Sequence, residues 1–447
     1  MTGRKSFWNE EIETMAPPEM RKLESERLAQ QIAYNYRTSP FLAAKLDLAG
    51  VKPADIKSVE DLAQIPFMEK AEIALSQKDG TLLGANQCAP LEDIVRIQAT
   101  GGTTGQPMRI GLTRQDIADY GEMAARALWA MDCRPSDIVF TCMNFSLYAG
   151  GVSDHMTFET LGATSIPYGV GQSEQLLKMM HGIKDDVCLW ATPSYAVRLA
   201  EVARNIGIDP RAVGIAKGFF SGEAGLQVPG YREKIEETWG MTASDMYGTG
   251  ELGLHSGECS HRRGVHYGGA GFAVIELIDP DTGTVLPFDD GRQGEVVYTS
   301  IQRQAGPLQR MRSHDIFQVF TEPCACGRTS FRFKILGRSD DMFIVKGVNV
   351  FPLSIQATLL SLRPRITGEF QVWLDRQPPI DYPVPIRVEV AHGLPAEAKD
   401  ALVREISERL QRVHNFSSAI VLVPQGSIAS EKKTRRVVRT YLGESAT

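Results

Sequence analysis

Glycine and threonine crowd the segment IQATGGTTGQP, residues 97–107. A chain of this composition can bend tightly and let its backbone approach a ligand closely. The backbone N–H groups of such a turn can point together at an anion, and threonine hydroxyls add further donors. The segment lacks the Gly-Lys-Ser/Thr ending of a P-loop. If it binds phosphate, a positive charge must come from elsewhere in the chain; the alternative is a plain loop.

A second group of residues could bind a metal. ECSHRRGVH contains Cys259, His261 and His266, and CACGR contains Cys324 and Cys326. A Cys-x-Cys pair in a tight turn can aim two thiolates at one ion, and three cysteines with one histidine are a common structural zinc set. A disulfide between such close cysteines would be strained. The pattern therefore predicts a structural zinc site, with reduced free thiols as the alternative.

The composition is that of an ordinary globular protein. The 447 residues are 43% hydrophobic and 23% charged, with a net charge of −6. This length favours two or three domains. The charge gives no electrostatic reason to expect nucleic acid or an anionic membrane as a partner. No apolar run approaches the roughly 20 residues of a membrane helix, and the acidic N-terminal segment is unlike a signal peptide. We expect a cytoplasmic protein.

These residues must be positioned by regular elements. Short apolar runs alternate with helical segments in the first half of the chain, which predicts a parallel sheet covered by helices. Strands are expected at 137–145, 163–169, 187–194 and 214–223, and two helices within 17–50. From about residue 270 the period changes to two, in 272–288 and 294–301. That change predicts an antiparallel hairpin region.

A domain boundary is expected near GRSDD, 337–341. Beyond it, strands are predicted at 369–375, 385–391 and 419–424, and an amphipathic helix at 395–413. The predicted fold class is α/β. A large N-terminal domain, residues 1–337, would combine mostly parallel sheets, flanking helices and a β-rich subdomain. A small mobile α+β domain, residues 338–447, would follow it.

Four further motifs follow the glycine-rich segment: MYGTGELG (246–253), QRMRSHD (309–315), LGRSDDMFIVKGVNVFP (336–352) and SEKKTRRVVR (430–439). Their order resembles the adenylate-forming superfamily of acyl-CoA synthetases. FWNEEIETM (7–15) and PFMEK (66–70) are most similar to its phenylacetate-CoA ligase branch. The resemblance covers nearly the whole chain. It implies a ligase forming carbon–sulfur bonds, AMP-forming, that uses ATP, Mg²⁺ and coenzyme A with a small carboxylic acid.

The resemblance also implies roles for individual residues. The catalytic residues would be Lys433 and Glu251, and Glu251 would bind Mg²⁺. Asp315 would bind the ribose hydroxyls, and Arg338 would lie nearby. Asp340 would be the hinge between the domains. Lys346 and Gly347 would lie near CoA. Nucleotide contacts would come from Thr100, Gly101, Gly102, Thr103, Thr104, Gly105, Tyr247, Gly248 and Thr249. The family pattern suggests His266 rather than His261 as the zinc ligand that completes Cys259, Cys324 and Cys326.

The resemblance implies that the acid pocket lies where this chain departs from the family. SGEAG (221–225) and NFSLYAGG (144–151) replace the usual family patterns. The predicted lining is Phe145, Tyr148, Phe220, Ser221, Glu223 and Tyr247. Aromatic walls suit a flat aryl or arylalkyl acid; these residues as plain core aromatics are the alternative.

Two rival functions remain open. An adenylate-forming enzyme could pass its acyl or adenylyl group to an amine, a carrier-protein thiol or a cofactor hydroxyl. A non-catalytic nucleotide- or zinc-binding module would share the composition but not need the combination of Thr104, Glu251, Asp315 and Lys433. The family resemblance also allows a homodimer.

Overall fold

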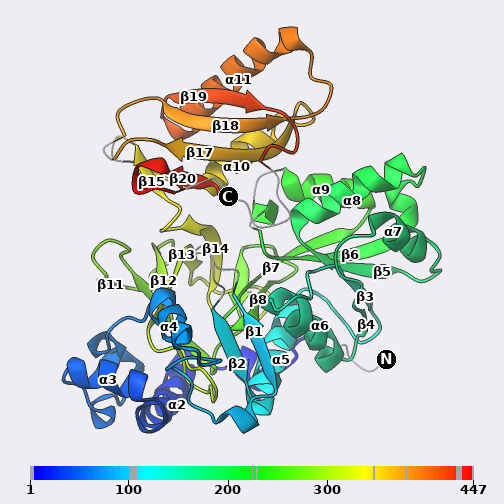
Figure 1. The fold of residues 1–447 in the computed structure, drawn as a ribbon. Helices are drawn as coiled ribbons and strands as arrows, with labels where there is room; N and C mark the ends of the chain where they lie inside the picture. Colours follow the sequence, from blue (N-terminus) through cyan, green and yellow to red (C-terminus); the bar gives the residue numbers. More distant parts are fainter. Residues whose placement is uncertain are drawn as a thin grey trace. The chain divides into compact units, whose positions relative to one another are not determined.

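The fold was obtained as a computed structural model that describes residues 5–100, 108–223, 225–227, 230–345, 348–377, 380–428 and 435–444 (Figure 1). The helices are α1 Glu10–Glu13, α2 Pro17–Thr38, α3 Pro40–Leu48, α4 Lys70–Ser76, α5 Arg114–Ala130, α6 Ala149–Leu161, α7 Ser173–His181, α8 Pro193–Asn205, α9 Tyr231–Trp239, α10 Pro352–Leu360 and α11 Ala396–His414.

The first strands are β1 Arg96–Ala99, β2 Arg109–Leu112, β3 Ile138–Thr141, β4 Thr164–Ile166, β5 Val187–Ala191, β6 Ile215–Phe220, β7 Thr242–Thr249, β8 Gly253–Glu258, β9 Val265–Tyr267 and β10 Ala273–Ile278. They are followed by β11 Val285–Leu286, β12 Gln293–Ser300, β13 Met311–Phe320, β14 Arg332–Arg338, β15 Phe343–Val345, β16 Val348–Val350, β17 Ile366–Leu374, β18 Val384–Val390, β19 Ser418–Val423 and β20 Val437–Arg439.

The described residues cluster into two compact units. One comprises Met1–Gln227, Arg232–Ser313 and Phe317–Lys334, and the other Val228–Tyr231, His314–Ile316 and Ile335–Thr447. Their division in the chain lies close to the boundary expected near residue 337. The functional roles assigned to the two domains remain predictions.

The large sheet joins a parallel half to an antiparallel half. Among the described residues its strand order is β11-β10-β12-β13-β14-β9-β8-β7-β6-β5-β3-β4. Strands β3 to β7 pair in parallel, whereas β7–β8, β8–β9 and β10–β12 pair antiparallel. The expected parallel strands and β-rich region are both present, and they form one continuous sheet because β7 has a parallel neighbour on one side and an antiparallel neighbour on the other.

Helices cover both faces of the parallel half: α5 and α6 lie on one side and α7, α8 and α9 on the other (Figure 1). The buried core formed by α5, α6 and the strands that they cover contains Leu128, Phe158, Val139, Trp190 and Phe219. Each such side chain contributes about 1.5–3 kcal/mol by leaving water. The successive strand residues Leu189 and Trp190 are both fully buried, as expected for a sheet covered on both faces.

Helix α5 begins with a capping box that also organises a distant loop. The Thr113 hydroxyl accepts from Asp116 N at 3.1 Å, and Asp116 Oδ2 accepts from Thr113 N at 3.0 Å. These bonds satisfy donors left open at a helix start. Asp116 Oδ1 also accepts from Gln304 N at 2.8 Å. The helix start therefore fixes the chain next to Arg303, which contacts the candidate site.

The C-terminal unit has its own sheet and core. The described strand order is β19-β18-β17-β20, with β17 and β18 antiparallel and the two outer pairings parallel. The core includes Ile355 and Leu359 of α10 and Leu402, Ile406 and Leu410 of α11. The α11 residues recur at four-residue intervals, which places them on one face of the helix. The α+β character expected from the sequence is confirmed.

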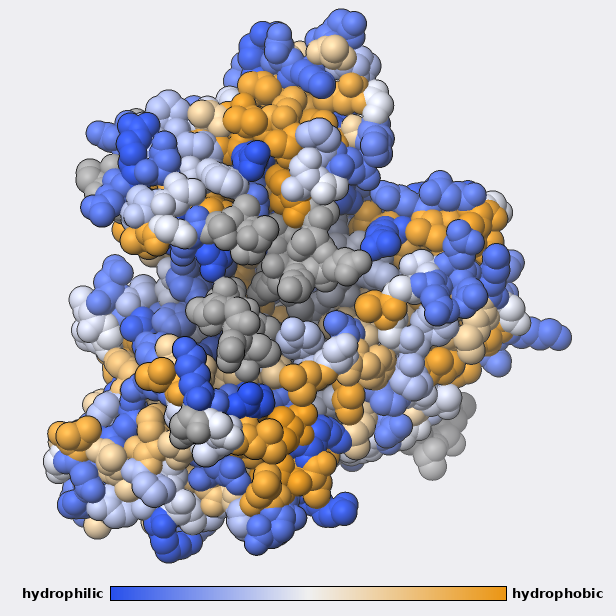
Figure 2. All heavy atoms as spheres, viewed as in Figure 1, coloured by the Kyte–Doolittle hydropathy of each residue, from blue (hydrophilic) through white to orange (hydrophobic). Residues whose placement is uncertain are grey.

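The surface and the helices add two general observations. Exposed hydrophobic residues form separate groups among hydrophilic ones on the face drawn in Figure 2, as on ordinary protein surfaces. Within the described residues, none of the helices combines the length and apolarity required to cross a membrane.

Candidate active site

The glycine-rich segment joins β1 to β2. Strands β1 and β2 pair antiparallel, and Thr100 N donates to Met108 O at 3.0 Å just beyond that pairing. Thr100 is buried. The other predicted phosphate contacts lie outside the described residues: Gly101, Gly102, Thr103, Thr104 and Gly105. The described part of the segment is thus the hydrogen-bonded base of a turn.

Thr100 packs directly against the turn between β7 and β8. A Cβ atom added to Gly250 would lie 2.8 Å from Thr100 Cγ2 and 3.2 Å from Thr100 Cα. Only glycine leaves room for this approach. Two sequence motifs far apart in the chain, the glycine-threonine segment and MYGTGELG, therefore meet at these two residues.

Gln98 connects the same turn to helix α6. Its side-chain nitrogen donates to Gly250 O at 2.9 Å, and its side-chain oxygen accepts from Ser153 Oγ at 2.5 Å. Gln98 is buried, and satisfying both ends of a buried amide fixes its orientation. The sequence did not single out Gln98, because only the folded chain brings its two partners to it.

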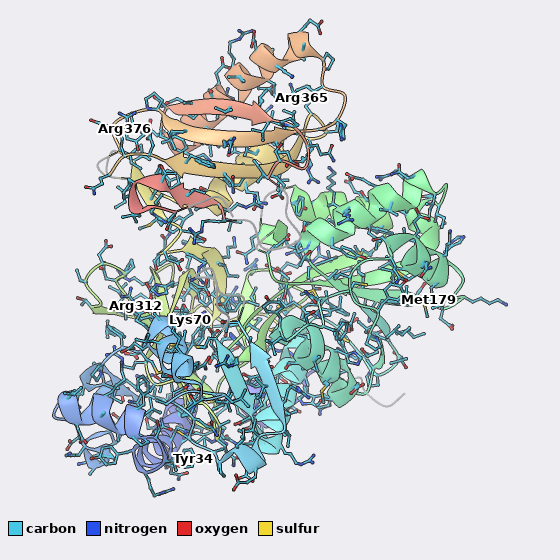
Figure 3. The ribbon with its side chains drawn as sticks, viewed as in Figure 1. Tyr34, Lys70, Met179, Arg312, Arg365 and Arg376 are labelled. Atoms are coloured by element: carbon cyan, nitrogen blue, oxygen red, sulfur yellow. The ribbon has the colours of Figure 1, made fainter. Side chains whose placement is uncertain are left out.

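Glu251 is buried and paired with a lysine that begins helix α4. Lys70 Nζ lies 2.7 Å from Glu251 Oε1, with 5% of the Glu251 side chain exposed. Burial alone would raise the pKa of Glu251, but the charge and hydrogen bond of Lys70 outweigh it and lower that pKa. Figure 3 shows Lys70 beside the sheet region that carries Arg312. The sequence had placed Lys70 in a family motif without giving it a role.

The backbone of Glu251 is held as firmly as its side chain. Glu251 O accepts from the Tyr120 hydroxyl and from Arg303 Nη1, the latter at 2.9 Å. Arg303 Nη1 also donates to the Tyr120 hydroxyl at 2.7 Å. Because Tyr120 lies on α5 and Arg303 follows β12, the turn is fixed from two elements. Glu251 also lines a pocket with about 360 Å³ of empty volume, together with Met108 and Gly306.

Tyr247 lies among aromatic rings at the end of β7. Its ring meets His255, Phe317 and Phe333 edge-on, with centroid distances of 5.4, 5.1 and 5.5 Å. Its hydroxyl accepts from the Tyr298 hydroxyl at 3.4 Å. This surrounding fixes the ring plane, a requirement for stacking on a flat ligand.

Gly248 and Thr249 shape the turn before Glu251. A Cβ atom at Gly248 would lie 2.6 Å from Gly253 O, where the β7–β8 register shifts. Thr249 Oγ1 accepts from Leu252 N at 3.1 Å, and its hydroxyl also hydrogen-bonds to the Glu251 carboxylate. The local sequence is therefore required by the close approach of two strands.

Asp315 in β13, Arg338 at the end of β14 and Asp340 just beyond it form one ion cluster. Arg338 Nη1 lies 3.1 Å from Asp315 Oδ1. Arg338 also donates to both oxygens of Asp340, at 2.8 and 2.7 Å. Burial would lower the pKa of Arg338, but hydrogen bonding to Asp340 and the charge of Asp315 raise it. Residues assigned to the ribose and to the hinge are thus directly coupled.

The predicted acid-pocket residues occupy different surroundings. Leu147 O accepts from Ala99 N at 2.7 Å, and Tyr148 forms a bridge with Ala99, so NFSLYAGG runs along the end of β1. Phe145 packs edge-on against His155 at 5.8 Å. Glu223 accepts from Ser194 Oγ at 2.6 Å. Their role toward an acid remains a prediction.

Phe220 and Ser221 lie at the end of β6. Phe220 is fully buried, and its ring covers Gly218 close to Met241. Ser221 N donates to Ala191 O at 3.3 Å. Ser221 therefore continues from the carboxyl end of a parallel strand, where α/β proteins usually bind ligands.

Three cysteines and His266 converge from three segments. Cys259 follows β8, His266 lies in β9, and Cys324 and Cys326 follow β13. Their ligand atoms all lie within 4.8 Å of one another. Cys259 Sγ is 3.7 Å from Cys324 Sγ, and Cys326 Sγ is 3.4 Å from His266 Nε2. His261 is exposed, so the structure brings His266 to the cysteines.

The cysteine thiols of the cluster influence one another. The interaction between Cys259 and Cys326 raises the pKa of Cys259 and lowers that of Cys326. His266 Nδ1 lies 3.5 Å from Ser330 Oγ. A partner on the second ring nitrogen is the usual arrangement of a metal-binding histidine.

The N-terminal segment packs on the cysteine-containing loop. Arg328 Nε donates to Glu13 Oε2 at 2.7 Å, and both side chains are buried. Thr329 Oγ1 donates to Met15 O at 2.7 Å, and Gly327 faces Phe7. The family motif FWNEEIETM therefore packs against the CACGRT loop.

Three further predicted residues have no described position. Lys433, Lys346 and Gly347 lie outside the described residues. The catalytic and CoA-binding roles assigned to them remain predictions.

Comparisons with known proteins identify the family of the chain. The family described as AMP-binding enzyme matches residues 28–303, and the AMP-binding enzyme C-terminal domain matches residues 347–440. Phenylacetate-coenzyme A ligase of Thermus thermophilus is 33% identical over 420 residues, covering 93% of this chain and 91% of that protein. The Escherichia coli enzyme of the same name is 31% identical over 435 residues, covering 95% and 96%.

Solved structures are similar over nearly the whole chain. 2-Hydroxyisobutyryl-CoA ligase in the postadenylation state with 2-HIB-AMP has a TM-score of 0.88 at 31% identity, covering 99% of this chain and 95% of that one. Its open conformation with 2-HIB-AMP and CoA has a TM-score of 0.75 at 31% identity, covering 98% and 95%. The family-model match and the extent of the match to the curated relatives show that the chain belongs to the AMP-binding enzyme family.

Proposed function

We propose that this chain is an ATP-dependent acid–CoA ligase of the AMP-forming type. The contact of Thr100 with Gly250, one residue before Glu251, is the observation that carries the proposal. It joins the base of an anion-binding turn to a buried carboxylate suited to Mg²⁺. Curated relatives named phenylacetate-coenzyme A ligases and the acyl-adenylate and CoA complexes of 2-hydroxyisobutyryl-CoA ligase support the same activity.

The proposed reaction has two steps. In the first, a carboxylate oxygen of the acid attacks the α-phosphorus of ATP, and the bond to the bridging oxygen breaks with release of pyrophosphate. In the second, the CoA thiolate attacks the acyl carbonyl, and the carbon–oxygen bond to AMP breaks. Positioning and electrostatic stabilisation contribute most to such transfers. The glycine-threonine turn, Thr100 to Gly105, would hold the β- and γ-phosphates.

The remaining nucleotide contacts are proposed for residues whose surroundings the structure describes. Tyr247, whose ring plane is fixed by its aromatic neighbours, would stack near adenine, with Gly248 and Thr249 at its side. Asp315 would accept both ribose hydroxyls, since one carboxylate offers several acceptor sites. Arg338, held by Asp315 and Asp340, would lie near the ribose and phosphate.

A moving C-terminal domain would separate the two steps. Lys433 would supply positive charge at the α-phosphate during adenylation, which answers the absence of a lysine from the glycine-rich segment. Asp340 would be the hinge, and its bidentate bond with Arg338 would have to persist or break as the domain turns. Lys346 and Gly347 would then lie near the incoming CoA. Boundary residues commonly absorb such rotations.

The residues around Glu251 fit a magnesium ion. Mg²⁺ prefers oxygen ligands and usually bridges one or two carboxylates to substrate phosphates. Glu251 is a buried residue that borders a pocket, and its carboxylate is paired with Lys70. When bound, Mg²⁺ would neutralise charge on the phosphate oxygens. Lys70 holds the carboxylate ionised, which is the form a cation requires.

The cysteine cluster fits structural zinc. A tetrahedral site with Zn–S near 2.3 Å and Zn–N near 2.05 Å has S···S edges of roughly 3.8 Å and S···N edges of roughly 3.6 Å. The separations of 3.7 Å for Cys259–Cys324 and 3.4 Å for Cys326–His266 agree with those edges. Four protein ligands leave no open position. The proposed zinc ion would therefore stabilise the loop that holds the N-terminal segment.

The acid is proposed to be a small carboxylic acid, of an aryl or arylalkyl type. Phe145, Tyr148, Phe220, Ser221, Glu223 and Tyr247 are the proposed surroundings of its body. The names of the relatives give two different acids, phenylacetate and 2-hydroxyisobutyrate. An enzyme that transfers its acyl or adenylyl group to an amine, a carrier-protein thiol or a cofactor hydroxyl is the alternative.

The decisive experiment separates the two steps. Pyrophosphate exchange would be measured with a panel of aryl, arylacetic and short aliphatic acids, and AMP release would be measured with CoA, amines or carrier protein. Lys433→Ala should abolish acid-dependent exchange and spare CoA attack on a supplied acyl-adenylate. Exchange at the parental rate in this variant would refute the role of Lys433. Release of AMP with amines but not with CoA would favour the alternative acceptor.

A further inference from the structure

Helix α6 contains a buried aspartate for which the described residues offer no partner. The side chain of Asp154 is buried, with the residue 6% exposed. No hydrogen bond or ion pair of its carboxylate is found among the described residues; the Thr157 hydroxyl donates to its backbone oxygen instead. Leaving a buried carboxyl without a donor is costly, and native proteins rarely tolerate it without a reason. Burial raises the pKa of Asp154 to about 7.

A glycine leaves this carboxyl uncovered on one side. Gly150 precedes Asp154 by one helical turn, so the two positions share a face of α6. A Cβ atom at Gly150 would lie 3.7 Å from Asp154 Oδ2 and 3.3 Å from Met143 Cε. The space that a side chain at Gly150 would take therefore borders both the Asp154 carboxyl and the flexible end of Met143.

The same methionine reaches the predicted acid pocket. A Cβ atom at Gly222 would lie 4.0 Å from Met143 Cε, so this methyl group lies between Gly150 and Gly222. Gly222 stands between Ser221 and Glu223 in the SGEAG turn. Met143 has the adaptable side chain that commonly fills irregular space and repacks around ligands.

Helix α6 is also tied to the proposed reaction centre. Ser153, the neighbour of Asp154, donates to Gln98, and Gln98 donates to the carbonyl of Gly250 beside Glu251. The helix begins at Ala149, within NFSLYAGG, and Tyr148 just before it forms a bridge with Ala99 at the end of β1. Asp154 is thus held on a rigid element anchored next to the site of acid activation.

We infer that Asp154 is a specificity-determining residue that accepts a hydrogen bond from an amino or hydroxyl group on the body of the acid substrate. The inference rests on the proposed acid activation. An acid that carries such a donor satisfies the buried carboxyl, whereas its unsubstituted analogue leaves it unpaired. Sites built around a buried polar group discriminate strongly against analogues that lack the complementary group. The substrate class is therefore a donor-bearing carboxylic acid rather than a purely apolar one.

The test compares matched acids. The kcat/KM of pyrophosphate exchange would be measured for benzoate against its amino- and hydroxy-derivatives, for phenylacetate against its own, and for isobutyrate against 2-hydroxyisobutyrate. The parent should prefer the best donor-bearing acid over its analogue by about 100-fold or more. Asp154→Ala should reduce that ratio to about 10-fold or less, and Asp154→Asn, which retains an acceptor oxygen, should fall between.

A second variant leaves the carboxyl in place. Gly150→Ala adds a methyl group beside Asp154 Oδ2, at a helical position where alanine is favoured over glycine. It should raise the melting temperature and still lower the preference for donor-bearing acids. Glu159→Gln, an exposed carboxylate on the same helix paired with His155, is the matched control and should keep the parental ratio.

The outcomes are distinct. Equal parental kcat/KM for donor-bearing and plain acids would overturn the inference and leave the ligase function standing. An Asp154→Ala variant with a lowered melting temperature and an unchanged ratio would assign Asp154 a purely structural role and also overturn it. Absence of exchange with every acid would overturn the proposed function and this inference together.

Discussion

Lys70 and Glu251 form an ion pair of 2.7 Å at the turn that carries the predicted magnesium ligand. The glutamate is buried, while Lys70 is 35% exposed at the first residue of α4. Lys70 therefore provides the counterion for a carboxylate that would otherwise be unpaired. A metal ion arriving with nucleotide would compete with Lys70 for the same oxygen or share it.

Replacing Lys70 should make stability depend on magnesium. Lys70→Met leaves Glu251 unpaired, and the free energy of unfolding should fall by roughly 2 kcal/mol, less than for a fully buried pair because Lys70 is partly exposed. Mg²⁺ should restore much of that loss by binding the free carboxylate. Thermal melts with and without Mg²⁺ measure both effects. The control is Lys45→Met, which breaks the 2.8 Å pair between Lys45 and Glu72, a residue of α4 like Lys70. Equal effects of Mg²⁺ on the stability of both variants would contradict the prediction.

Adding one methyl group at Gly250 should damage activation of the acid. Gly250→Ala would place a Cβ atom 2.8 Å from Thr100 Cγ2, and the base of the glycine-threonine turn must shift. Displacements of this kind cost about 10- to 100-fold in rate, so pyrophosphate exchange should fall by that factor. Gly182→Ala is the control, because its Cβ would meet only ordinary contacts at 3.4 Å and beyond. Unchanged exchange in Gly250→Ala would show that the contact is dispensable.

Removing one proposed zinc ligand should destabilise the protein without abolishing its chemistry. Cys326→Ser should lose bound zinc, as measured by elemental analysis, and the free energy of unfolding should fall by several kcal/mol, about 3 or more, because metal binding is coupled to folding. Adenylation measured well below the melting temperature should persist, since a closed site has no catalytic position. Cys188→Ser, a buried thiol in the core below α6, should retain zinc. Zinc-free parental protein would refute the site.

His255 should make stability sensitive to acid. Burial lowers the pKa of His255 from its ordinary value of 6.5 to about 3. The unfolded chain therefore binds a proton that the folded chain excludes. The stabilisation is fully present above pH 6.5 and is lost as the pH falls toward about 3. At pH 5 the loss from this residue is about 2 kcal/mol. Urea unfolding at pH 7 and pH 5 should show a smaller acid effect in His255→Phe, and parallel losses would contradict this.

Local patterns in the sequence were sufficient to predict the parallel strands and to identify the motif residues. Apolar runs bounded by turns located β3, β4, β5 and β6, because strands covered on both faces are apolar throughout. Strand β13 was harder to predict, since MRSHDIFQVF carries charges. Those charges are satisfied only in the fold: Arg312, for example, pairs with Glu295 at 2.7 Å. Strand β13 was read only as a motif.

The site was predictable as a set of residues and less so as a set of contacts. Thr100 and Glu251 were identified from motif order. Gln98 was missed because its amide reaches a carbonyl 152 positions away, and no local pattern marks that contact. Asp154 was missed because an aspartate in a helix usually faces solvent. Its significance comes from burial and from the neighbouring glycine, which only the three-dimensional structure reveals.

The ion pair between Glu13 and Arg328 has a consequence for biosynthesis. Its two residues are 315 positions apart, so the ribosome must add most of the polypeptide before the first helix can find its docking site. Until Arg328 has been synthesised, the N-terminal segment cannot form this ion pair and the large sheet is incomplete. This is the period when nascent chains are most prone to misassembly. The N-terminal segment can therefore complete its packing only after the last strands of the large sheet and the cysteine-containing loop after β13 have been synthesised.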